Sequence, residues 1–450
     1  MLSQLARREG SGMFKTMKKS STIFLVIALL AALTACGSKN DNATNDKSGQ
    51  ADAKQVKLKF YAQYSGENIQ VYDAAKAAMK EKMPEVNVEF EVAAQDDDQK
   101  IKTYAAAGSL PDIFSASSGL IEVLKNSGNL MELDQVVEEN HIEDLLNDIT
   151  KKTLRNKDGH IYAVPEVGQW SAVIYYNKEL FQKNNIKVPE NYTEFLQAVN
   201  AFHSAGITPL SLFAKEKWPG VQLYDMAVVG SEPEGIKRLD NGEGDFSDEA
   251  YQGASQKISE LVKAGMLSKN AFTMTWDDAL AQFTSGNSAM ILNGAWAMND
   301  FYKQMGDKFG ILYTPLTDAD KIADHKWNVS GGGGGASGGF AVSKNSDNKE
   351  VAAKYAALFS LEYGKQRVYL LGDPNPVQID NPEPKDGFSP IQKQYKEDAV
   401  NFKTMSVFPW GLENPKFKTS LEDNVQKLLN GQSVDGFTND MNKALENARK

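Results

Sequence analysis

Tryptophans in short, loop-like contexts are the residues of this 450-residue chain that point most directly to ligand chemistry. Three of the six are flanked by glycine or proline: WPG at Trp218, GAWA at Trp296 and PWG at Trp410. An indole covers an apolar C–H face, such as that of a sugar ring, while nearby polar groups bind the hydroxyls at its rim. The alternative for any one tryptophan is a place in the hydrophobic core.

Catalytic patterns have little support in the sequence. The only match to G-x-S-x-G, Gly335–Gly339, follows a glycine run and leads into a strand rather than a helix, so we interpret it as chance. A glycoside hydrolase needs two opposed carboxylates, and 59 acidic residues leave such a pair open, but no hydrolase motif is present. We therefore expect a protein that is not an enzyme and has no cofactor.

Metal-binding patterns are also weak. The four histidines, at 141, 160, 203 and 325, are scattered and have no H-x-x-x-H or cysteine partner, so a zinc site lacks support. The acidic run Asp240–Asp248 departs from EF-hand spacing and predicts a turn that leads into a helix. Calcium binding at this run is left open, and no metal site is predicted.

The single cysteine, Cys36, directly follows an apolar run, Ile23–Leu33, that comes after three lysines. This run has the length of a signal-peptide core and is shorter than the roughly 20 residues of a membrane span, so residues 1–35 are predicted to be a signal peptide. A lone cysteine also excludes an internal disulfide. Leu33-Thr34-Ala35-Cys36 resembles the lipobox of bacterial lipoproteins, which implies a diacylglyceryl thioether and acyl chains such as palmitate on Cys36.

Residues 36–55 contain no aromatic and no large aliphatic side chain, and they predict a flexible tether. The chain has a net charge of −10 although its first 35 residues are basic, so the remainder is more acidic still. This argues against nucleic acid and against an anionic membrane surface as the main partner. No second apolar segment approaches a membrane span, so the chain is not itself a permease.

Beyond residue 55, strand and helix patterns alternate. The first six elements run β-α-β-α-β-α and predict a parallel sheet flanked by helices: 56–63, 68–82, 86–92, 99–107, 112–115 and 121–126. Later strands are expected at 161–165, 172–176 and 288–293, and later helices at 192–205, 248–264, 275–284, 348–361, 421–430 and 438–448. The 395 residues after residue 55 are too many for a single hydrophobic core and suit two lobes.

The order of these elements resembles the extracellular solute-binding proteins of ABC importers, in the branch that binds sugars and oligosaccharides. The segments that carry the resemblance are AGSLPDIF at 107–114, GHIYAVP at 159–165, IYYNKELF at 174–181, FTSGNSAMILNGAW at 283–296, GGFAVSKNS at 338–346 and the helical stretch 424–445. The resemblance implies an α/β, two-lobe, periplasmic-binding-protein-like fold (type II), in which each lobe is a helix-flanked sheet and the ligand cleft lies between them. We expect the first lobe to comprise 56–166 and 336–386, and the second 167–335 and 387–450.

Polar candidates for the cleft lie near strand ends and near the expected crossings between the lobes. Asp112 precedes a strand, and the small hydroxyls Ser115 and Ser118 follow it; a capping or turn role is the alternative for Asp112. The resemblance implies a first crossing near 165–170, which would place Gln169 and Trp170 by the cleft. It implies a second crossing within the glycine tract near 335–340, where Gly338 would allow bending or close approach to a ligand; a mobile surface loop is the alternative.

Aromatic candidates follow from the resemblance as well. The family has a stacking aromatic after N-G-x-W, matched by Trp296, and another in the loop before the last helices, matched by Trp410. Tyr64, at the end of the first strand, is a similar candidate. Three further candidates complete the set: Trp218, Asp225 and Glu413. Glu413 lies near Trp410 and could bind sugar hydroxyls, with helix capping as its alternative.

The predicted function is capture of a sugar or oligosaccharide outside the cell and its delivery to a membrane permease. The chain has no P-loop, so a separate cytoplasmic ATPase must supply the energy. We expect a monomer held on the outer face of the cell membrane by its lipid anchor. The alternatives are a receptor for polyamines, peptides or metals on the same fold, and an anchored carbohydrate-active enzyme.

Overall fold

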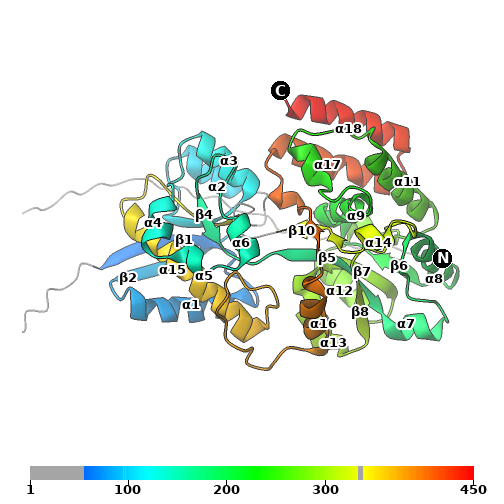
Figure 1. Cartoon of the computed structure of the whole chain (residues 1–450), viewed down its shortest axis with the longest axis horizontal. Helices are drawn as coiled ribbons and strands as arrows, with labels where there is room; N and C mark the ends of the chain where they lie inside the picture. The colour runs from blue at the N-terminus through cyan, green and yellow to red at the C-terminus, as the bar shows by residue number, and fades with distance from the viewer. Residues whose placement is uncertain (1–54, 95, 97, 333–337) are drawn as a thin grey trace, which may run out of the picture. The chain divides into compact units, whose positions relative to one another are not determined.

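The computed structural model describes residues 55–94, 96, 98–332 and 338–450. Two β-sheets organise this part of the chain, and helices surround each sheet (Figure 1). Cys36, the predicted signal peptide and the predicted tether up to residue 54 lie outside the described residues. No helix among the described residues is long and apolar enough to cross a membrane.

The first sheet has the strand order β2-β1-β3-β11-β4, and we call the part built on it the first lobe. β1 (Val56–Ala62) pairs in parallel with β2 (Val86–Val92) and with β3 (Ile113–Ser117), which confirms the predicted parallel sheet. β11 (Gly338–Val342) runs antiparallel to both β3 and β4 (Ala163–Pro165). A late segment of the chain thus completes a sheet that the first segments begin.

Helices surround this sheet (Figure 1). They are α1 (Asn68–Lys82), α2 (Gln99–Ala106), α3 (Ser118–Asn126), α4 (Asp134–Glu139), α5 (Ile142–Leu145), α6 (Asp148–Lys152) and α15 (Lys349–Gln366). In α1, the buried residues Val71, Tyr72, Ala75 and Met79 recur at helical spacing. α15 continues directly into a π-helical turn, η5 (Arg367–Leu371).

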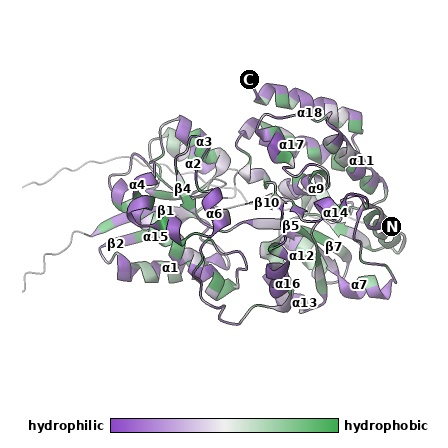
Figure 2. Ribbon diagram, in the orientation of Figure 1, coloured by the Kyte–Doolittle hydropathy of each residue, from purple (hydrophilic) through white to green (hydrophobic). Residues whose placement is uncertain are grey.

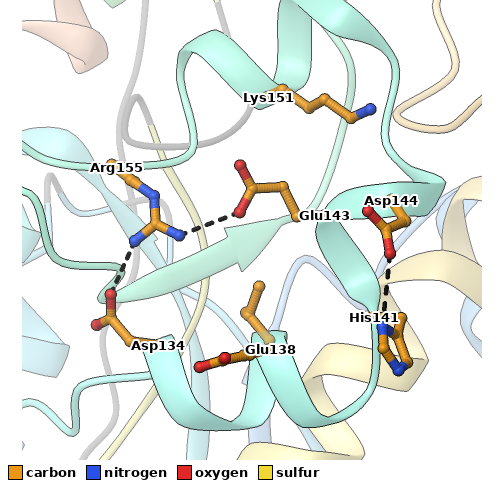
Figure 3. A pocket seen from close by; sticks show the side chains of 8 residues that line it. Asp134, Glu138, His141, Glu143, Asp144, Lys151 and Arg155 are labelled. Carbon is orange, nitrogen blue, oxygen red and sulfur yellow. Dashed lines mark hydrogen bonds and ion pairs between the residues drawn. The ribbon is translucent and has the colours of Figure 1, made fainter.

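A polar recess of about 430 Å³ lies over α4–α6 (Figure 3). Several of its charged groups pair with one another: Arg155 donates to Asp134 at 2.9 Å and to Glu143 at 3.0 Å, and His141 lies 3.5 Å from Asp144. None of the site residues predicted from the sequence lines this recess. Local ion pairing therefore accounts for five of its charged groups, Asp134, Glu143, Arg155, His141 and Asp144.

The second sheet has the order β10-β5-β7-β6, with β8 also paired to β5, and we call the part built on it the second lobe. β5 (Trp170–Asn177) runs antiparallel to β7 (Ser288–Gly294), β8 (Phe309–Leu312) and β10 (Gly331–Gly332). β6 (Thr208–Ser211) pairs in parallel with β7. A small separate pair joins β9 (Asn328–Val329) to β12 (Thr404–Met405).

The second lobe contains most of the helices. They are α7 (Lys178–Lys183), α8 (Tyr192–Ser204), α9 (Trp218–Val228), α10 (Ile236–Asp240), α11 (Glu249–Lys263), α12 (Trp276–Thr284), α13 (Met298–Met305), α14 (Ile322–His325), α16 (Pro390–Ala399), α17 (Pro415–Leu429) and α18 (Val434–Ala448). Short 3₁₀ turns add η1 (Ala214–Glu216), η2 (Ala271–Thr273), η3 (Ala295–Ala297) and η6 (Pro409–Gly411). WPG at Trp218 thus begins a helix rather than occupying a loop, with Pro219 in its first turn, where a missing N–H costs nothing.

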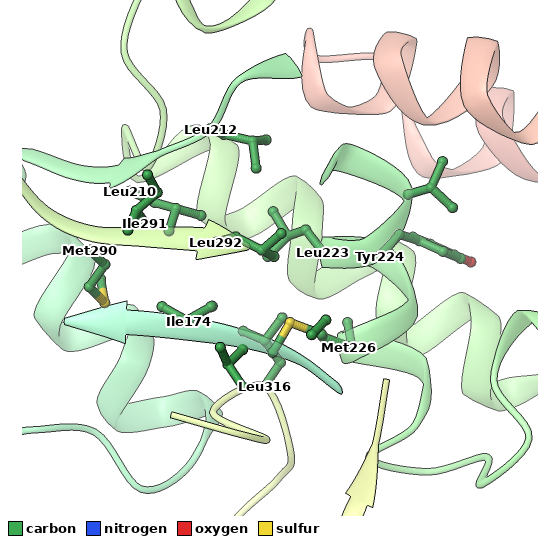
Figure 4. Packing of buried hydrophobic residues seen from close by; sticks show 14 of the residues in the cluster. Ile174, Leu210, Leu212, Leu223, Tyr224, Met226, Met290, Ile291, Leu292 and Leu316 are labelled. Atoms are coloured by element: carbon green, nitrogen blue, oxygen red, sulfur yellow. The ribbon is translucent and has the colours of Figure 1, made fainter. Parts of the chain in front are cut away.

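The core of the second lobe lies on both faces of its sheet. Every residue of β7 is buried, and Ile174, Leu210 and Leu292 pack with side chains of α9 (Figure 4). Apolar colour is concentrated on the strands, whereas the outer faces of the helices are polar (Figure 2). This layered burial holds the strand ends, and the loops that follow them, in fixed positions.

The chain leaves the first sheet at Pro165 and enters the second at Trp170. It returns between β10 and β11, where residues 333–337 lie outside the described part of the chain, so the predicted glycine hinge is described only from Gly338 onward. The residue limits of the lobes stay a prediction.

Candidate binding cleft

Five aromatic rings from distant parts of the sequence come together in the second lobe. Trp170 begins β5, Trp218 begins α9 and Trp296 lies in η3 after β7, while Phe408 and Trp410 lie at η6. Of the five, Trp170 and Phe408 are buried and the other three are partly exposed. We call these five side chains the aromatic platform.

Trp296 lies at the centre of the aromatic platform. Its ring centroid is 6.0 Å from Trp170, 5.9 Å from Trp218 and 6.0 Å from Trp410. Phe408 stacks on Trp410 with centroids 4.5 Å apart and the two planes within 6°. Such mutual contacts hold the rings in fixed orientations, which lowers the entropy lost when a ligand stacks on them.

Gly294 explains the spacing of N-G-A-W. A Cβ at this position would lie 2.1 Å from the indole of Trp296, so only glycine lets the ring fold back over the end of β7. The φ angle of Gly294 is an ordinary −78°, and space rather than backbone conformation therefore requires the glycine.

A cavity of about 430 Å³ opens beside the aromatic platform. It is lined by Gln63, Asn68, Asp98, Ser115, Ala116, Ser117, Glu166, Val167, Gly338, Gly339, Tyr363, Arg367 and Trp410. Trp410 comes from the second lobe, whereas the strand ends of the first sheet provide much of the remaining wall. Its size is typical of small-ligand sites, which span roughly 300–1,000 Å³.

Hydrogen-bonding groups in this cavity are held by contacts with their neighbours. Glu166 accepts from the Tyr72 hydroxyl at 2.6 Å; burial raises the pKa of the Glu166 carboxyl, and the hydrogen bond from Tyr72 opposes that rise. Asp98 accepts from Ser117 at 2.9 Å and has a left-handed φ of 65°. Such backbone strain outside glycine is concentrated at functional sites.

Arg367 links this cavity to a smaller recess of about 50 Å³, which Trp170 and Trp296 also line. Its Nε donates to Asp373 at 2.8 Å, and its guanidinium lies 5.9 Å from the Trp170 ring. Burial lowers the pKa of Arg367, but its interactions with the Asp373 carboxylate and with Tyr363 together outweigh burial, and the net pKa is raised. The guanidinium therefore stays charged, and it lies in the π-helical turn η5, a type of distortion common at functional sites.

Six sequence-predicted residues come together around this space. Ser115, Gly338 and Trp410 line the larger cavity, Trp170 and Trp296 line the smaller recess, and Trp218 contacts the last two tryptophans of the aromatic platform. A Cβ at Gly338 would lie 2.9 Å from Ala116 O, and its φ of 138° favours glycine. Their roles in binding a ligand stay predictions.

Asp112 and two other predicted residues lie elsewhere in the first lobe. Asp112 precedes β3 and so lies at the opposite end of that strand from Ser117; it accepts from the Lys59 amide at 2.8 Å and from Ser346. The structure therefore favours the turn role for Asp112. Tyr64 stacks on Phe90 at 5.0 Å and lines neither space, nor does Ser118, which is buried at the start of α3.

Asp225, Glu413 and Gln169 also lie outside both cavity walls. Asp225 is completely buried within α9, so it cannot touch a ligand in this conformation, and the prediction of direct contact is wrong for it. Glu413 is engaged in an ion pair with Lys157 at 2.7 Å, and the helix-capping alternative fails because Asn414 is the N-cap of α17. Gln169 is half-buried in the segment before β5.

Sequence reasoning missed Arg367, Asp98, Glu166 and Phe408. Arg367 had a usable signal, because it is an isolated arginine in RVYLLG that follows a long apolar helix. Asp98 and Glu166 could not be distinguished from the many other acidic residues, because their shared cavity forms only in three dimensions. Phe408 was detectable in FPWG, two residues before a predicted stacking tryptophan.

Asp240 and Asp248, the two ends of the acidic run, have partners within the protein. Asp240 accepts from the amides of Glu413 and Asn414, and Asp248 pairs with Arg238 at 2.8 Å. As predicted, the run leads into a helix, α11. Elsewhere, Glu132, Asp134 and His160 bring potential metal ligands within 4.8 Å of one another, but Asp134 is already paired with Arg155.

The sequence matches the model of a known protein family. The model of the bacterial extracellular solute-binding protein family matches residues 70–366, which is well over half of the sequence. The chain therefore belongs to the bacterial extracellular solute-binding proteins, and the predicted two-lobe α/β fold is confirmed. Membership implies a location outside the cytoplasm, at the cell exterior or in the periplasm.

Curated relatives are similar over most of their length. An uncharacterized ABC transporter extracellular-binding protein of Pyrococcus horikoshii is 22% identical, with 94% of this chain and 95% of the relative covered. The multiple sugar-binding protein of Streptococcus mutans is 25% identical, with 66% of this chain and 69% of the relative covered.

Solved structures are similar across nearly their whole chains. One, described in work on xylan utilization by Caldanaerobius polysaccharolyticus, is 26% identical with a TM-score of 0.75, and 86% of this chain and 99% of that chain are covered. A chitin oligosaccharide binding protein is 22% identical with a TM-score of 0.75, and 88% of this chain and 99% of that chain are covered. This similarity supports the two-lobe fold.

Proposed function

We propose that this protein is the substrate-binding component of an ABC importer and that it captures a neutral oligosaccharide outside the cell. One observation carries the proposal: an aromatic platform in the second lobe borders a cavity whose other walls hold hydroxyls, carboxylates and a guanidinium. Apolar faces flanked by hydrogen-bonding groups match the surface of a sugar ring. The names of the Streptococcus mutans relative and of the chitin oligosaccharide binding protein support the same ligand class.

The mechanism follows from the position of Trp410. Sugar rings stack on Trp296 and Trp410, and their hydroxyls bond to groups of the first lobe such as Asp98 and Ser115. Because a bound ligand then touches both lobes, binding shifts the population toward the closed form, which docks on the permease. A micromolar dissociation constant corresponds to about −8 kcal/mol, within reach of two stacked rings and several hydrogen bonds.

A second candidate is a cationic ligand such as a polyamine. Asp98 and Glu166 line the larger cavity, and Glu67 and Asp300 line the smaller recess, whereas Arg367 is the basic residue in both linings. Two observations favour the sugar: Arg367 remains charged, and Glu67 is already paired with Lys303.

A thermal-shift screen of the purified protein tests both candidates, because a ligand that binds only the folded state raises Tm by mass action. The panel comprises raffinose, kestose, xylotriose, chitotriose and maltotriose, with spermidine, a tripeptide and calcium as comparisons. A saturable shift with a trisaccharide supports the proposal, and a shift with spermidine alone overturns the ligand class. Chromatography of the sugar after incubation tests whether the protein leaves it intact, as we infer for a protein that is not an enzyme.

We also propose that Cys36 is lipidated after removal of residues 1–35 and that residues 36–55 tether a monomeric receptor to the membrane. The lipobox-like LTAC and the polar composition that follows it support this arrangement. Stable anchoring requires at least two acyl chains, which a diacylglyceryl group supplies. Mass spectrometry of the membrane-bound protein should find the diacylglyceryl group on Cys36, and Cys36→Ser should leave the protein unlipidated.

A further inference from the structure

We propose that Asp225 is a positioning residue for the aromatic platform, and that its carboxylate fastens the loop carrying Phe408 and Trp410 to the helix that begins with Trp218. This inference rests on the proposed function, which assigns the aromatic platform as a ligand surface. Asp225 itself does not line the cavity; it acts through the segments that it joins.

Three segments converge on this carboxylate. Its Oδ2 accepts from Ser330 Oγ at 2.5 Å and from Ser406 Oγ, and its Oδ1 accepts from the Ile236 amide at 2.8 Å. Ser406 lies two residues before Phe408, and Ser330 lies directly before β10. The donors therefore come from the loop that carries Phe408 and Trp410, which we call the platform loop, from the residue between β9 and β10, and from the start of α10.

The same contacts extend to Trp170. Ser406 Oγ also accepts from the Gly331 amide at 3.3 Å, and Gly332 pairs with Trp170 across β10 and β5. The chain between Ser406 and Trp410 is short and contains Pro409, so fixing one end strongly restricts the other. The hydrogen bonds of Asp225 are thus connected to four of the five platform rings. Phe408 and Trp410 are reached through Ser406, Trp170 through β10, and Trp218 through α9, the helix that carries Asp225.

Burying a carboxylate costs free energy, which its hydrogen bonds to these segments must offset. The hydrogen-bond partners of Asp225 are two hydroxyls and an amide, and burial raises its pKa. The surrounding backbone is adapted to it: Gly235 has a φ of 58°, and a Cβ there would lie 2.2 Å from Asp225 Oδ1. Three donors from three segments hold the platform loop in place more specifically than an apolar contact would.

Ser406→Ala and Asp225→Ala test the proposal, with Asp225→Asn as the conservative rescue and Ser255→Ala as the matched control. Ser255 is also fully buried, and its hydroxyl contacts Tyr224, the neighbour of Asp225 on α9, but it has no contact with the platform loop. Three quantities are compared for each variant: Tm, the near-UV circular dichroism of the unliganded protein, and affinity for the trisaccharide of the panel that binds the wild type most tightly.

We expect Ser406→Ala to change the tryptophan bands of the unliganded protein and to weaken trisaccharide binding at least fivefold, and Asp225→Ala to weaken it at least tenfold. Asp225→Asn should restore most of the affinity, because its amide can still bond all three segments. Ser255→Ala should lower Tm by a similar amount while leaving affinity within twofold. In a Trp410→Phe background, Ser406→Ala should cause little further spectral change.

The proposal is overturned if Ser406→Ala behaves like Ser255→Ala in both spectrum and affinity. If Asp225→Ala does not fold, the spectra and affinities of Ser406→Ala and Ser330→Ala test the proposal instead, since each variant removes only one hydroxyl. If no trisaccharide binds the wild type, the proposed function fails; the spectra of the unliganded variants then still decide whether Asp225 orders the aromatic platform.

Discussion

Lys157 Nζ lies 2.7 Å from Glu413 Oε2 and so joins the loop before β4 of the first lobe to the segment after η6 of the second. The same ammonium donates to Asn241 at 3.3 Å. Glu413, predicted as a ligand residue, thus has a partner in the other lobe. The pair therefore connects the two lobes close to the aromatic platform.

Glu413→Gln should weaken trisaccharide binding by no more than about fivefold, since a solvent-exposed ion pair contributes at most about 1 kcal/mol. The loss should shrink as salt is raised, because salt screens the pair. Titration calorimetry at low and high salt measures this. Glu179→Gln is the control, since its partner Lys308 lies in the same lobe. A loss above tenfold at every salt concentration would instead return Glu413 to direct ligand contact.

Trp296→Ala should weaken binding at least tenfold, or about 1.4 kcal/mol, because the ring lies at the centre of the aromatic platform. Trp327→Ala is the matched control: Trp327 is a partly buried tryptophan of the same lobe that packs on Tyr313 and Phe402, outside the platform. Binding is measured by calorimetry and folding by circular dichroism. Equal affinities in the two variants would remove Trp296 from the site.

Arg367→Met should lower the free energy of unfolding by about 3 kcal/mol or more, because it leaves the Asp373 carboxylate buried without its cation. Arg367→Met/Asp373→Asn should recover much of that loss, since the second change removes the stranded charge. Urea unfolding measures both variants. Neither variant should regain wild-type trisaccharide affinity, because the guanidinium lines both cavity and recess. Full affinity in the double variant would assign the pair a structural role only.

Asp225 should make stability fall as pH rises through its titration. Burial raises its pKa from 3.8 to about 6, so between these values the folded protein binds a proton that the unfolded chain does not. The free energy of unfolding therefore decreases with pH over this window, by about 3 kcal/mol for a shift of this size. Asp225→Asn should lack this component. The difference in Tm between wild type and variant, followed from pH 4 to 8, measures it, and a pH-independent difference would contradict the prediction.

Elements with strong periodicity were predictable from the sequence. The helix predicted at 68–82 and the strand predicted at 86–92 match α1 and β2 because each presents a clear apolar pattern. α9 was missed because ten of its eleven residues are buried, so no polar face marks its period. β6 was missed because it has four residues and includes a proline.

The candidate site was predictable only in part. N-G-A-W has a local cause, since Gly294 makes room for the ring of Trp296, and a local cause leaves a pattern in the sequence. Asp112 was assigned to the cleft because it lies near a strand, but it lies at the wrong end of β3. Because β3 has only five residues, a shift of that length along the chain moves a side chain from one end of the strand to the other.

By itself, the sequence determined the family, the alternation of strands and helices, and the four tryptophans that form the aromatic platform with Phe408. These features depend on short-range order and on residue type. Only the tertiary structure decided that Trp170, Trp218, Trp296 and Trp410 come together, that Arg367 lies in both cavity walls and that Asp225 is buried and bonded to the loop of Phe408 and Trp410. The physical reason is that burial and hydrogen bonding among segments far apart in the chain depend on how both sheets pack, which no local pattern records.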